Sequence, residues 1–179
     1  MTTVVLCRHA EPGNADQARC LARSLAALAP AAVYTSPLER AADTARAIAH
    51  VHDVTPVEVD DLREIDFGEA DGLTFDELPP SLQQGLLNEP ADFRFPGGEN
   101  YRELQQRVCR ALAQIVAAHC GGTVVVVTHA GPIRAALAHW LSMPGDASFR
   151  IDQRHAAVNV VEWREGVPLV RLVNGSALS

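Results

Sequence analysis

Two apolar runs far apart in the chain each end at a histidine. The first is VVLCRHAEP, Val4–Pro12, and the second is VVVVTHAGP, Val124–Pro132. Short valine-rich runs bounded by turn residues predict strands that are buried on both faces of a sheet. We therefore expect central strands at Thr3–Cys7 and Thr123–Thr128, in a fold whose other elements cover both faces of the sheet.

Helical patterns alternate with the apolar runs, which is typical of α/β proteins. The expected helices are Ala15–Leu28, Pro37 to about His50, a short one at Phe75–Leu78, Tyr101–Ala118 and Pro132–Leu141. The further expected strands are Ala31–Thr35, Val57–Val59, Ser148–Ile151, Ala157–Trp163 and Leu169–Val173, the last three towards the sheet edge. This order predicts a three-layer α/β/α sandwich with a mostly parallel central sheet. No linker or repeat interrupts it, so we expect one domain over residues 1–179.

The stretch TSPLER contains a helix-start pattern. Ser36 is the expected N-cap, Pro37 occupies the first helical position, and Glu39 completes a capping box. This start places Arg40 in the first turn, facing back towards the end of the preceding strand.

Charge limits what the chain can bind. The formal net charge is −7 and no basic stripe is present, which argues against nucleic-acid binding. An anion is repelled at long range, so a phosphate site requires a local arginine cluster. The four cysteines form no CxxC pair, and neither a secretory signal nor a membrane-spanning run is visible. We expect a soluble, cytoplasmic protein without membrane contact. Its oligomeric state is left open, a homodimer included.

The candidate site lies where the strands end. In open α/β sheets, ligands bind outside the carboxyl ends of the strands. Arg8, His9 and His129 follow two such ends, and Arg40 begins the helix after a third. Helix N-termini add backbone N–H donors, Ala130 among them. Arginines, histidines and amide groups together suit a tetrahedral dianion, so we expect a small phosphorylated metabolite as the ligand.

These residue types also suggest a reaction. A neutral imidazole can accept a phosphoryl group on one ring nitrogen while a backbone carbonyl holds the other nitrogen. A carboxyl group would then protonate the leaving alkoxide and later activate water. Glu64, in LREIDFG, is our candidate. The acidic residues crowded around it leave open that it belongs to a solvated surface.

Four ordered motifs resemble those of the histidine phosphatase superfamily, which includes the phosphoglycerate mutases: LCRHAEP, YTSPLERAADTA, LREIDFGEADG and VVVVTHAGPIR. The resemblance implies a phosphoglycerate mutase-like fold. It implies that His9 is the phosphorylated nucleophile, that Arg8, Arg40 and His129 bind the phosphoryl group, and that Glu64 donates a proton. It also implies that neither a metal nor another cofactor takes part.

The C-terminal stretches LSMPGDASFRIDQRHAAVNVVEW and VRLVNGS look like those of α-ribazole phosphatases, which suggests α-ribazole 5'-phosphate as the substrate. Two departures from the family pattern are visible. Ala10 stands where the family has glycine, and the loop after Glu11 is shorter, with Asn14 one residue before the usual asparagine position. We expect this short loop to leave a more open pocket.

Other functions remain open at this point. They are a generic sugar- or nucleotide-phosphate phosphatase, a mutase of the phosphoglycerate type, and a non-catalytic protein that binds a phosphorylated ligand. A mutase usually has a long insertion that covers the site and keeps water from the phosphate. This chain is short in that region, which favours hydrolysis. A zinc site built on His9 and His129 is disfavoured, because two adjacent arginines would repel the cation.

Overall fold

The structure, a computed structural model, describes residues 1–176. Within that range six strands form one sheet in the order β3-β2-β4-β1-β5-β6. The strands are β1 (Thr2–Arg8), β2 (Ala32–Thr35), β3 (Val57–Glu58), β4 (Thr123–Thr128), β5 (Val158–Arg164) and β6 (Val167–Gly175). β1 to β4 run parallel, whereas β5 pairs antiparallel with both β1 and β6. The mostly parallel sheet is as the sequence predicted.

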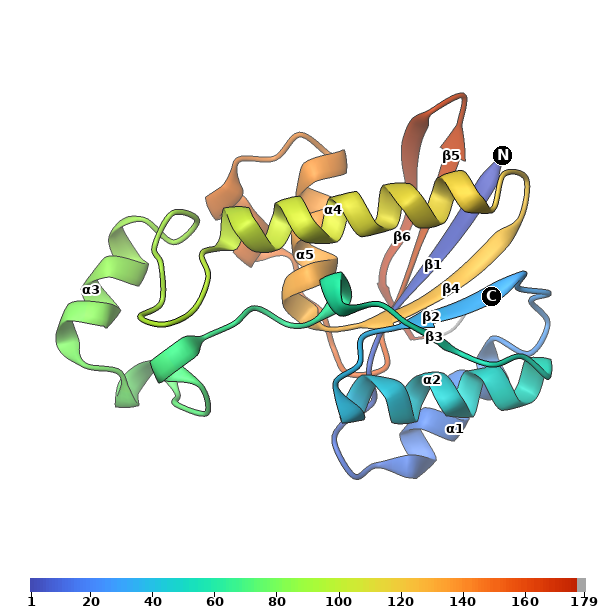
Figure 1. Ribbon diagram of the computed structural model, residues 1–179, viewed down its shortest axis with the longest axis horizontal. Coiled ribbons are helices and arrows are strands. Elements are labelled where there is room, and N and C mark those ends of the chain that lie inside the picture. The colour runs from blue at the N-terminus through green and yellow to red at the C-terminus, as the bar shows by residue number, and fades with distance from the viewer. Residues whose placement is uncertain (177–179) are drawn as a thin grey trace.

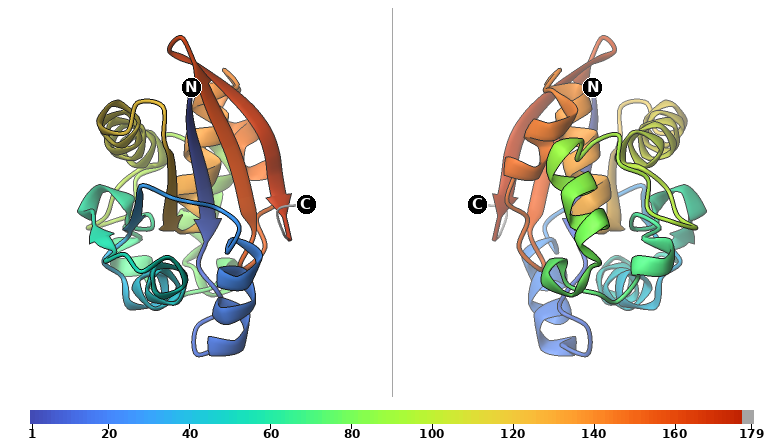
Figure 2. Two further views of the ribbon diagram at one scale, coloured as in Figure 1. Left: turned by 90° about the vertical axis from the view of Figure 1, so that its right-hand side faces the viewer. Right: turned by 90° about the vertical axis from the view of Figure 1, so that its left-hand side faces the viewer.

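Helices cover both faces of this sheet, so the expected three-layer sandwich is confirmed (Figures 1 and 2). The long helices are α1 (Ala15–Ser24), α2 (Glu39–His52), α4 (Tyr101–Ala118) and α5 (Ala130–Trp140). Side chains of a strand alternate between faces. In β1, Val4 and Leu6 accordingly pack with α4 and α5, while Val5 and Cys7 pack with α1 and α2. The apolar residues of both central strands are buried, which explains their unbroken apolar runs.

A small lobe at residues 65–99 extends away from the sheet, on the left of Figure 1. It contains α3 (Pro80–Asn88) and the short 3₁₀ turns η2 (Gly68–Ala70) and η3 (Phe75–Glu77). Ala70, Leu78 and Phe95 form its own small apolar core. Two backbone segments of the lobe pass very close to each other at Gly68. A Cβ atom on Gly68 would lie 2.1 Å from the Pro96 carbonyl oxygen, so only glycine fits there. The sequence predicted only the turn at Phe75–Leu78 in this region.

Three local predictions are wrong. α2 begins at Glu39 with Leu38 as N-cap, and no side chain caps it. The Ser36 N–H still follows the sheet, donating to the Val127 carbonyl at 3.0 Å, so the helix cannot begin at Ser36.

The other two wrong predictions concern the end of α1 and the expected strand Ser148–Ile151. α1 ends at Ser24 rather than Leu28, and the chain continues in turns. The expected strand Ser148–Ile151 belongs instead to a 3₁₀ helix, η4 (Gly145–Arg150), in which the Ser148 hydroxyl donates to the Gly145 carbonyl at 2.6 Å. That local bond offers the backbone an alternative to sheet pairing.

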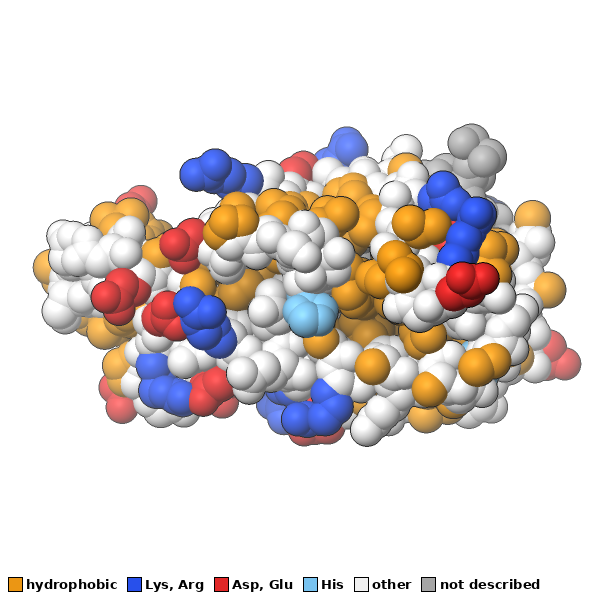
Figure 3. Space-filling view, turned by 90° about the horizontal axis from the view of Figure 1, so that it is seen from above, with side chains coloured by type: hydrophobic (Ala, Val, Ile, Leu, Met, Phe, Trp, Pro, Cys, Tyr) orange, Lys and Arg blue, Asp and Glu red, His pale blue; other side chains and the backbone are white. Residues whose placement is uncertain are grey.

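The surface carries no obvious basic stripe on the face seen from above. Figure 3 shows acidic and basic side chains interspersed around the edge of that face. This distribution agrees with the net charge of −7. Among residues 1–176, no helix is both long and apolar enough to cross a bilayer.

Candidate active site

The pairing of β1 with β4 brings the two motif histidines together. The strands run parallel with Arg8 opposite Thr128, so the next residues, His9 and His129, leave the sheet side by side. The His9 N–H donates to the Thr128 carbonyl at 2.9 Å, which extends the pairing by one residue. The two ring centroids lie 5.0 Å apart. This spacing allows both imidazoles to contact one tetrahedral anion.

His9 is held as a neutral imidazole with one nitrogen free. Its Nδ1 lies 2.7 Å from the Ala10 carbonyl oxygen, and only an N–H can donate to that acceptor. Burial lowers the pKa of His9 to about 4, helped by the positive charges of Arg40 and Arg8. At neutral pH the Nε2 atom therefore keeps its lone pair. This is the tautomer that a nucleophilic imidazole requires.

His129 presents a donor in place of a nucleophile. Its Nε2 lies 2.8 Å from the Ser36 hydroxyl, and that oxygen already accepts from the Leu38 N–H at 3.3 Å. A serine oxygen has two acceptor lone pairs, so the hydroxyl can donate to Nε2 while it accepts from Leu38. Burial lowers the pKa of His129 to about 2, so the ring is neutral, and with the hydroxyl as the donor its single proton lies on Nδ1. The buried Nδ1 has no hydrogen-bond partner among the described residues, so its N–H lacks an acceptor within the protein.

Arg8 is oriented by the segment before β5. Its guanidinium donates to the Gln153 carbonyl at 2.5 Å and lies 2.8 Å from Nε2 of His155. Since a guanidinium can only donate, His155 accepts with a neutral ring. The His155 ring also lies 5.3 Å from the His9 ring. The sequence analysis assigned no site role to His155, because no local pattern marks a residue that precedes a strand.

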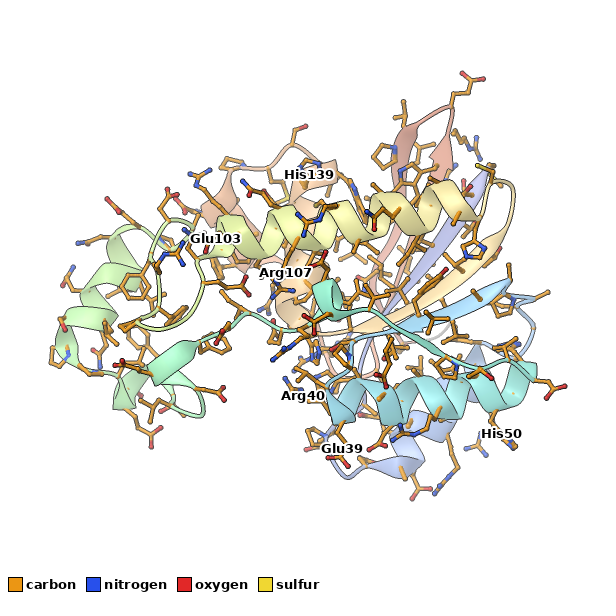
Figure 4. All side chains as sticks on the ribbon, in the orientation of Figure 1. Glu39, Arg40, His50, Glu103, Arg107 and His139 are labelled. Carbon is orange, nitrogen blue, oxygen red and sulfur yellow. The ribbon has the colours of Figure 1, made fainter. Side chains whose placement is uncertain are left out.

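Arg40 completes the group. Figure 4 places it at the start of α2, near the ends of the strands, whereas His50 lies at the other end of the same helix. The charge of Arg40 lowers the pKa of both His9 and His129, so its guanidinium lies within electrostatic reach of both rings. We call Arg8, His9, Arg40 and His129 the anion cup.

Glu64 borders the cup as a protonatable acid. Its carboxylate oxygens accept from the Ile65 N–H at 3.0 Å and from the Gly131 N–H at 3.4 Å. Burial raises the pKa of Glu64, while these hydrogen bonds and the charges of Arg40 and Arg8 oppose the rise. The side chain is only half-buried. Glu64 thus contacts the first turn of α5 instead of standing in a solvated charge cluster, and its role as the acid stays a prediction.

One arginine that the sequence analysis did not single out fixes the Glu64 loop. Arg107, on α4, donates to the carbonyls of Asp61, Arg63 and Glu64 at 2.8, 2.8 and 2.9 Å. It also pairs with Glu99 at 2.5 Å, and both side chains are less than one-fifth exposed. A single planar guanidinium thereby sets the path of the loop that carries the acid. Its signal in the sequence is indistinguishable from that of a solvated helix arginine.

Two cavities lie on either side of Glu64. One, of about 380 Å³, is lined mainly by charged side chains, among them Arg40, Arg63 and Arg107. The other, of about 290 Å³, lies under the lobe and is almost wholly apolar. We call the second cavity the apolar pocket. Ala130 and Gly131, the first residues of α5, line it, so it opens beside His129.

The remaining sequence predictions have mixed outcomes. Ala130 begins α5, where its N–H has no partner within the helix, so it is placed as a donor should be. Asn14 does not reach the cup: its side chain is exposed and caps α1 by accepting from the Gln17 N–H at 3.0 Å. A cavity of about 280 Å³ lies between the Glu11 loop and Arg40. The more open active-site pocket that the short loop predicts stays a prediction.

Comparison with known proteins identifies the family. The model of the histidine phosphatase superfamily (branch 1) matches residues 5–176. The chain belongs to the histidine phosphatase superfamily. This match confirms the family that the four sequence motifs indicated.

Relatives of this chain are named for several activities. The Bifunctional protein Rv2228c of Mycobacterium tuberculosis is 37% identical over 148 residues, which cover 80% of this chain and 40% of that protein. The Metal-independent phosphoserine phosphatase of Arabidopsis thaliana is 38% identical over 141 residues, covering 76% and 58%. The chain thus spans less than two thirds of either relative. The solved structure of Bacillus stearothermophilus YhfR is 27% identical, with a TM-score of 0.90 over 100% of this chain and 98% of that one.

Replacing Gly131 should displace the carboxyl group of Glu64 without unfolding the chain. A Cβ atom there would lie 2.2 Å from Oε1 of Glu64, which is the movable end of a side chain. We expect Gly131→Ala to lower kcat/KM for an alkyl phosphate by about 10²-fold, since such a displacement misplaces a catalytic group. Urea unfolding should change by less than about 1 kcal/mol.

Gly122→Ala is the matched control, because its Cβ would make only an ordinary contact, 3.5 Å from the His119 carbonyl oxygen. It should keep full activity. Full activity in Gly131→Ala would instead contradict the position assigned to Glu64.

The pH dependence of kcat/KM should report the ionisation of His9 and Glu64, because kcat/KM reflects groups of the free enzyme. Activity should fall as the pH drops through about 4, where His9 gains a proton and loses its lone pair. It should also fall as the pH rises through the raised pKa of Glu64, where the acid loses its proton. A pH series with methyl phosphate tests this once the rates are corrected for the second ionisation of the substrate, near about pH 6. An acid limb near the ordinary histidine pKa of about 6.5 that remains after this correction would contradict the account.

Proposed function

We propose that this chain is a phosphomonoesterase that works through a phosphohistidine on His9. The observation that supports this most is the state of the two rings in the anion cup. His9 is neutral with a free Nε2 lone pair, and the neighbouring His129 offers a buried N–H 5.0 Å away, centroid to centroid. A binding protein needs donors alone, whereas a nucleophile needs an imidazole fixed in this tautomer.

The first half-reaction forms the phosphoenzyme. The Nε2 lone pair of His9 attacks phosphorus, and the bond from phosphorus to the ester oxygen breaks. Glu64 gives its proton to that oxygen, so a neutral alcohol leaves. The raised pKa of Glu64 keeps the proton available for this transfer.

The second half-reaction releases phosphate. Water attacks the phosphoryl group opposite the N–P bond, and the Glu64 carboxylate takes one proton from it. The electron pair of the N–P bond returns to Nε2, which restores neutral His9. Inorganic phosphate leaves with the charge of the ester it came from, so protons and charge balance over the cycle.

The rest of the cup stabilises charge on the transferred group. Arg8 and Arg40 supply fixed positive charge, and the Nδ1–H of His129 and the N–H of Ala130 supply neutral donors. All four act on the non-bridging oxygens. Held in place before the reaction, they need little reorganisation when the charge develops.

The natural substrate is a second, finer proposal. We propose a small phosphorylated metabolite, with α-ribazole 5'-phosphate as the first candidate and a role in cobalamin synthesis as its consequence. The C-terminal sequence supports this choice, while the matching α-ribazole phosphatase structures, at 21% and 20% identity, support the fold alone. Phosphoserine is the competing candidate because the Arabidopsis relative is named for it.

The cellular compartment of the enzyme and its number of domains are also proposals. All four cysteines are free thiols, which favours a reducing compartment such as the cytoplasm. The single domain over residues 1–179 remains a prediction.

Hydrolysis of small phosphate monoesters tests the function directly. Wild-type protein should release phosphate from methyl phosphate and O-phosphoserine, with and without EDTA. His9→Ala should lose at least about 10³-fold in kcat/KM, the scale seen when a covalent nucleophile is removed.

His50→Ala is the control, because His50 is exposed at the far end of α2 (Figure 4) and should keep full activity. Equal background rates in wild type and His9→Ala would favour the binding protein. Conversion of 3-phosphoglycerate into 2-phosphoglycerate without net phosphate release would favour the mutase.

A further inference from the structure

The apolar pocket has an unusual composition for this chain. The sequence contains only five phenylalanines, and all five line this one cavity: Phe67, Phe75, Phe93, Phe95 and Phe149. Four of them come from the lobe and one from η4, so separate segments converge to build the wall. Protein cores are close-packed, whereas these rings surround an empty volume of about 290 Å³. Packing of a core therefore does not account for them.

The rings are arranged as in an aromatic box. Phe95 makes edge-to-face contacts with Phe67 and Phe93 at centroid distances of 5.0 and 5.2 Å. On the opposite wall, Tyr101 and Phe149 lie 4.9 Å apart. Ring pairs of this kind hold each other in fixed orientations. The pocket is therefore preformed rather than collapsed.

Two apolar residues of the pocket wall are largely exposed to solvent. Leu73 and Phe75 are 46% and 44% exposed although both line the pocket. Exposed apolar surface that borders a cavity marks a place where a ligand binds. An apolar ligand would remove this surface from water.

Charge in the pocket is confined to its mouth and one wall. Within residues 1–176, the only charged side chains that line it are those of Glu64 and Arg134, and the only other polar side chain is that of Tyr101. The Nε of Arg134 donates to the Ile151 carbonyl at 2.7 Å. Tyr101 is 3% exposed, and its hydroxyl makes no hydrogen bond of ordinary geometry among the described residues. Burial raises the pKa of this hydroxyl, while the Ser148 side chain lies near enough to oppose the rise. Such a wall can bind one oxygen or nitrogen at the edge of an otherwise apolar group.

We propose that the apolar pocket binds the alcohol half of the substrate, and that this alcohol carries an aromatic ring. The inference rests on the proposed function. Glu64 must reach the ester oxygen to protonate it. It lines both this pocket and the charged cavity, but its carboxylate accepts from the N–H of Gly131, which lines this pocket alone, so we infer that the leaving group extends from the cup into it. The ring would then stack against phenylalanines, while an ammonium or a second phosphate would be buried without enough partners.

The test compares alkyl phosphates whose leaving oxygens are similarly basic, so that binding and not intrinsic reactivity decides the order. The substrates are methyl phosphate, benzyl phosphate, O-phosphoserine, 3-phosphoglycerate and α-ribazole 5'-phosphate. We expect kcat/KM for benzyl phosphate to exceed that for methyl phosphate and phosphoserine by about 10- to 100-fold, the range for burying one ring. The α-ribazole ester then decides whether a fused bicyclic base or a simple ring is preferred.

A matched pair of variants locates the effect. Phe75→Ser should lower the benzyl-to-methyl ratio of kcat/KM by about 10-fold, and because Phe75 is 44% exposed the fold should tolerate the change. Leu87→Ser changes a residue of the same lobe that is 66% exposed and does not line the pocket, so it should leave the ratio as in wild type. If Phe75→Ser fails to fold, inhibition of wild type by benzylphosphonate against methylphosphonate gives the same comparison.

The outcomes separate this inference from the proposed function. Turnover of phosphoserine or 3-phosphoglycerate equal to or faster than that of benzyl phosphate would overturn the aromatic pocket while leaving the phosphatase intact. An equal ratio in Phe75→Ser and Leu87→Ser would do the same. Absence of any hydrolysis that depends on His9 would instead remove the proposed function itself.

Discussion

The parallel pairing of β1 with β4 is the interaction on which the site depends. Its register sets Arg8 opposite Thr128, and the residues that follow are His9 and His129. A slip of one residue would turn every side chain of β1 to the other face of the sheet, and would move both His9 and its backbone bond to Thr128. Because both strands are buried on both faces, packing from above and below specifies this register strongly.

Electrostatics gives the paired rings their chemistry. Burial beside two arginines keeps both imidazoles neutral, since a third positive charge there would be repelled. Different hydrogen bonds then give the two neutral rings different roles: the Ala10 carbonyl leaves His9 with a lone pair, and the Ser36 hydroxyl leaves His129 with a proton. One hydrogen bond each thus gives these two identical side chains the states that the proposed nucleophile and the proposed donor require.

Features that depend on residues adjacent in the sequence could be predicted. The buried strands, the long helices and the convergence of Arg8, His9, Arg40 and His129 all follow from apolar runs that end at charged residues. Contacts between distant segments were not predictable. Ser36 fits a helix cap in its local sequence, but in the fold its hydroxyl bonds His129, 93 positions away. Arg107 resembles a solvated residue until three carbonyls of the Glu64 loop surround it, and the phenylalanines of the lobe have no periodic spacing that would reveal a common pocket.

Trapping the phosphoenzyme tests the central claim most directly. Glu64→Gln should still be phosphorylated by nitrophenyl phosphate, because nitrophenolate leaves without needing an acid, but it lacks the base that activates water. A rapid-quench experiment should therefore give a burst of one nitrophenolate per active site, and mass spectrometry should find an acid-labile phosphoryl group on His9. No burst, a phosphoryl group on another residue, or the same burst in a His9→Ala, Glu64→Gln double variant would contradict the account.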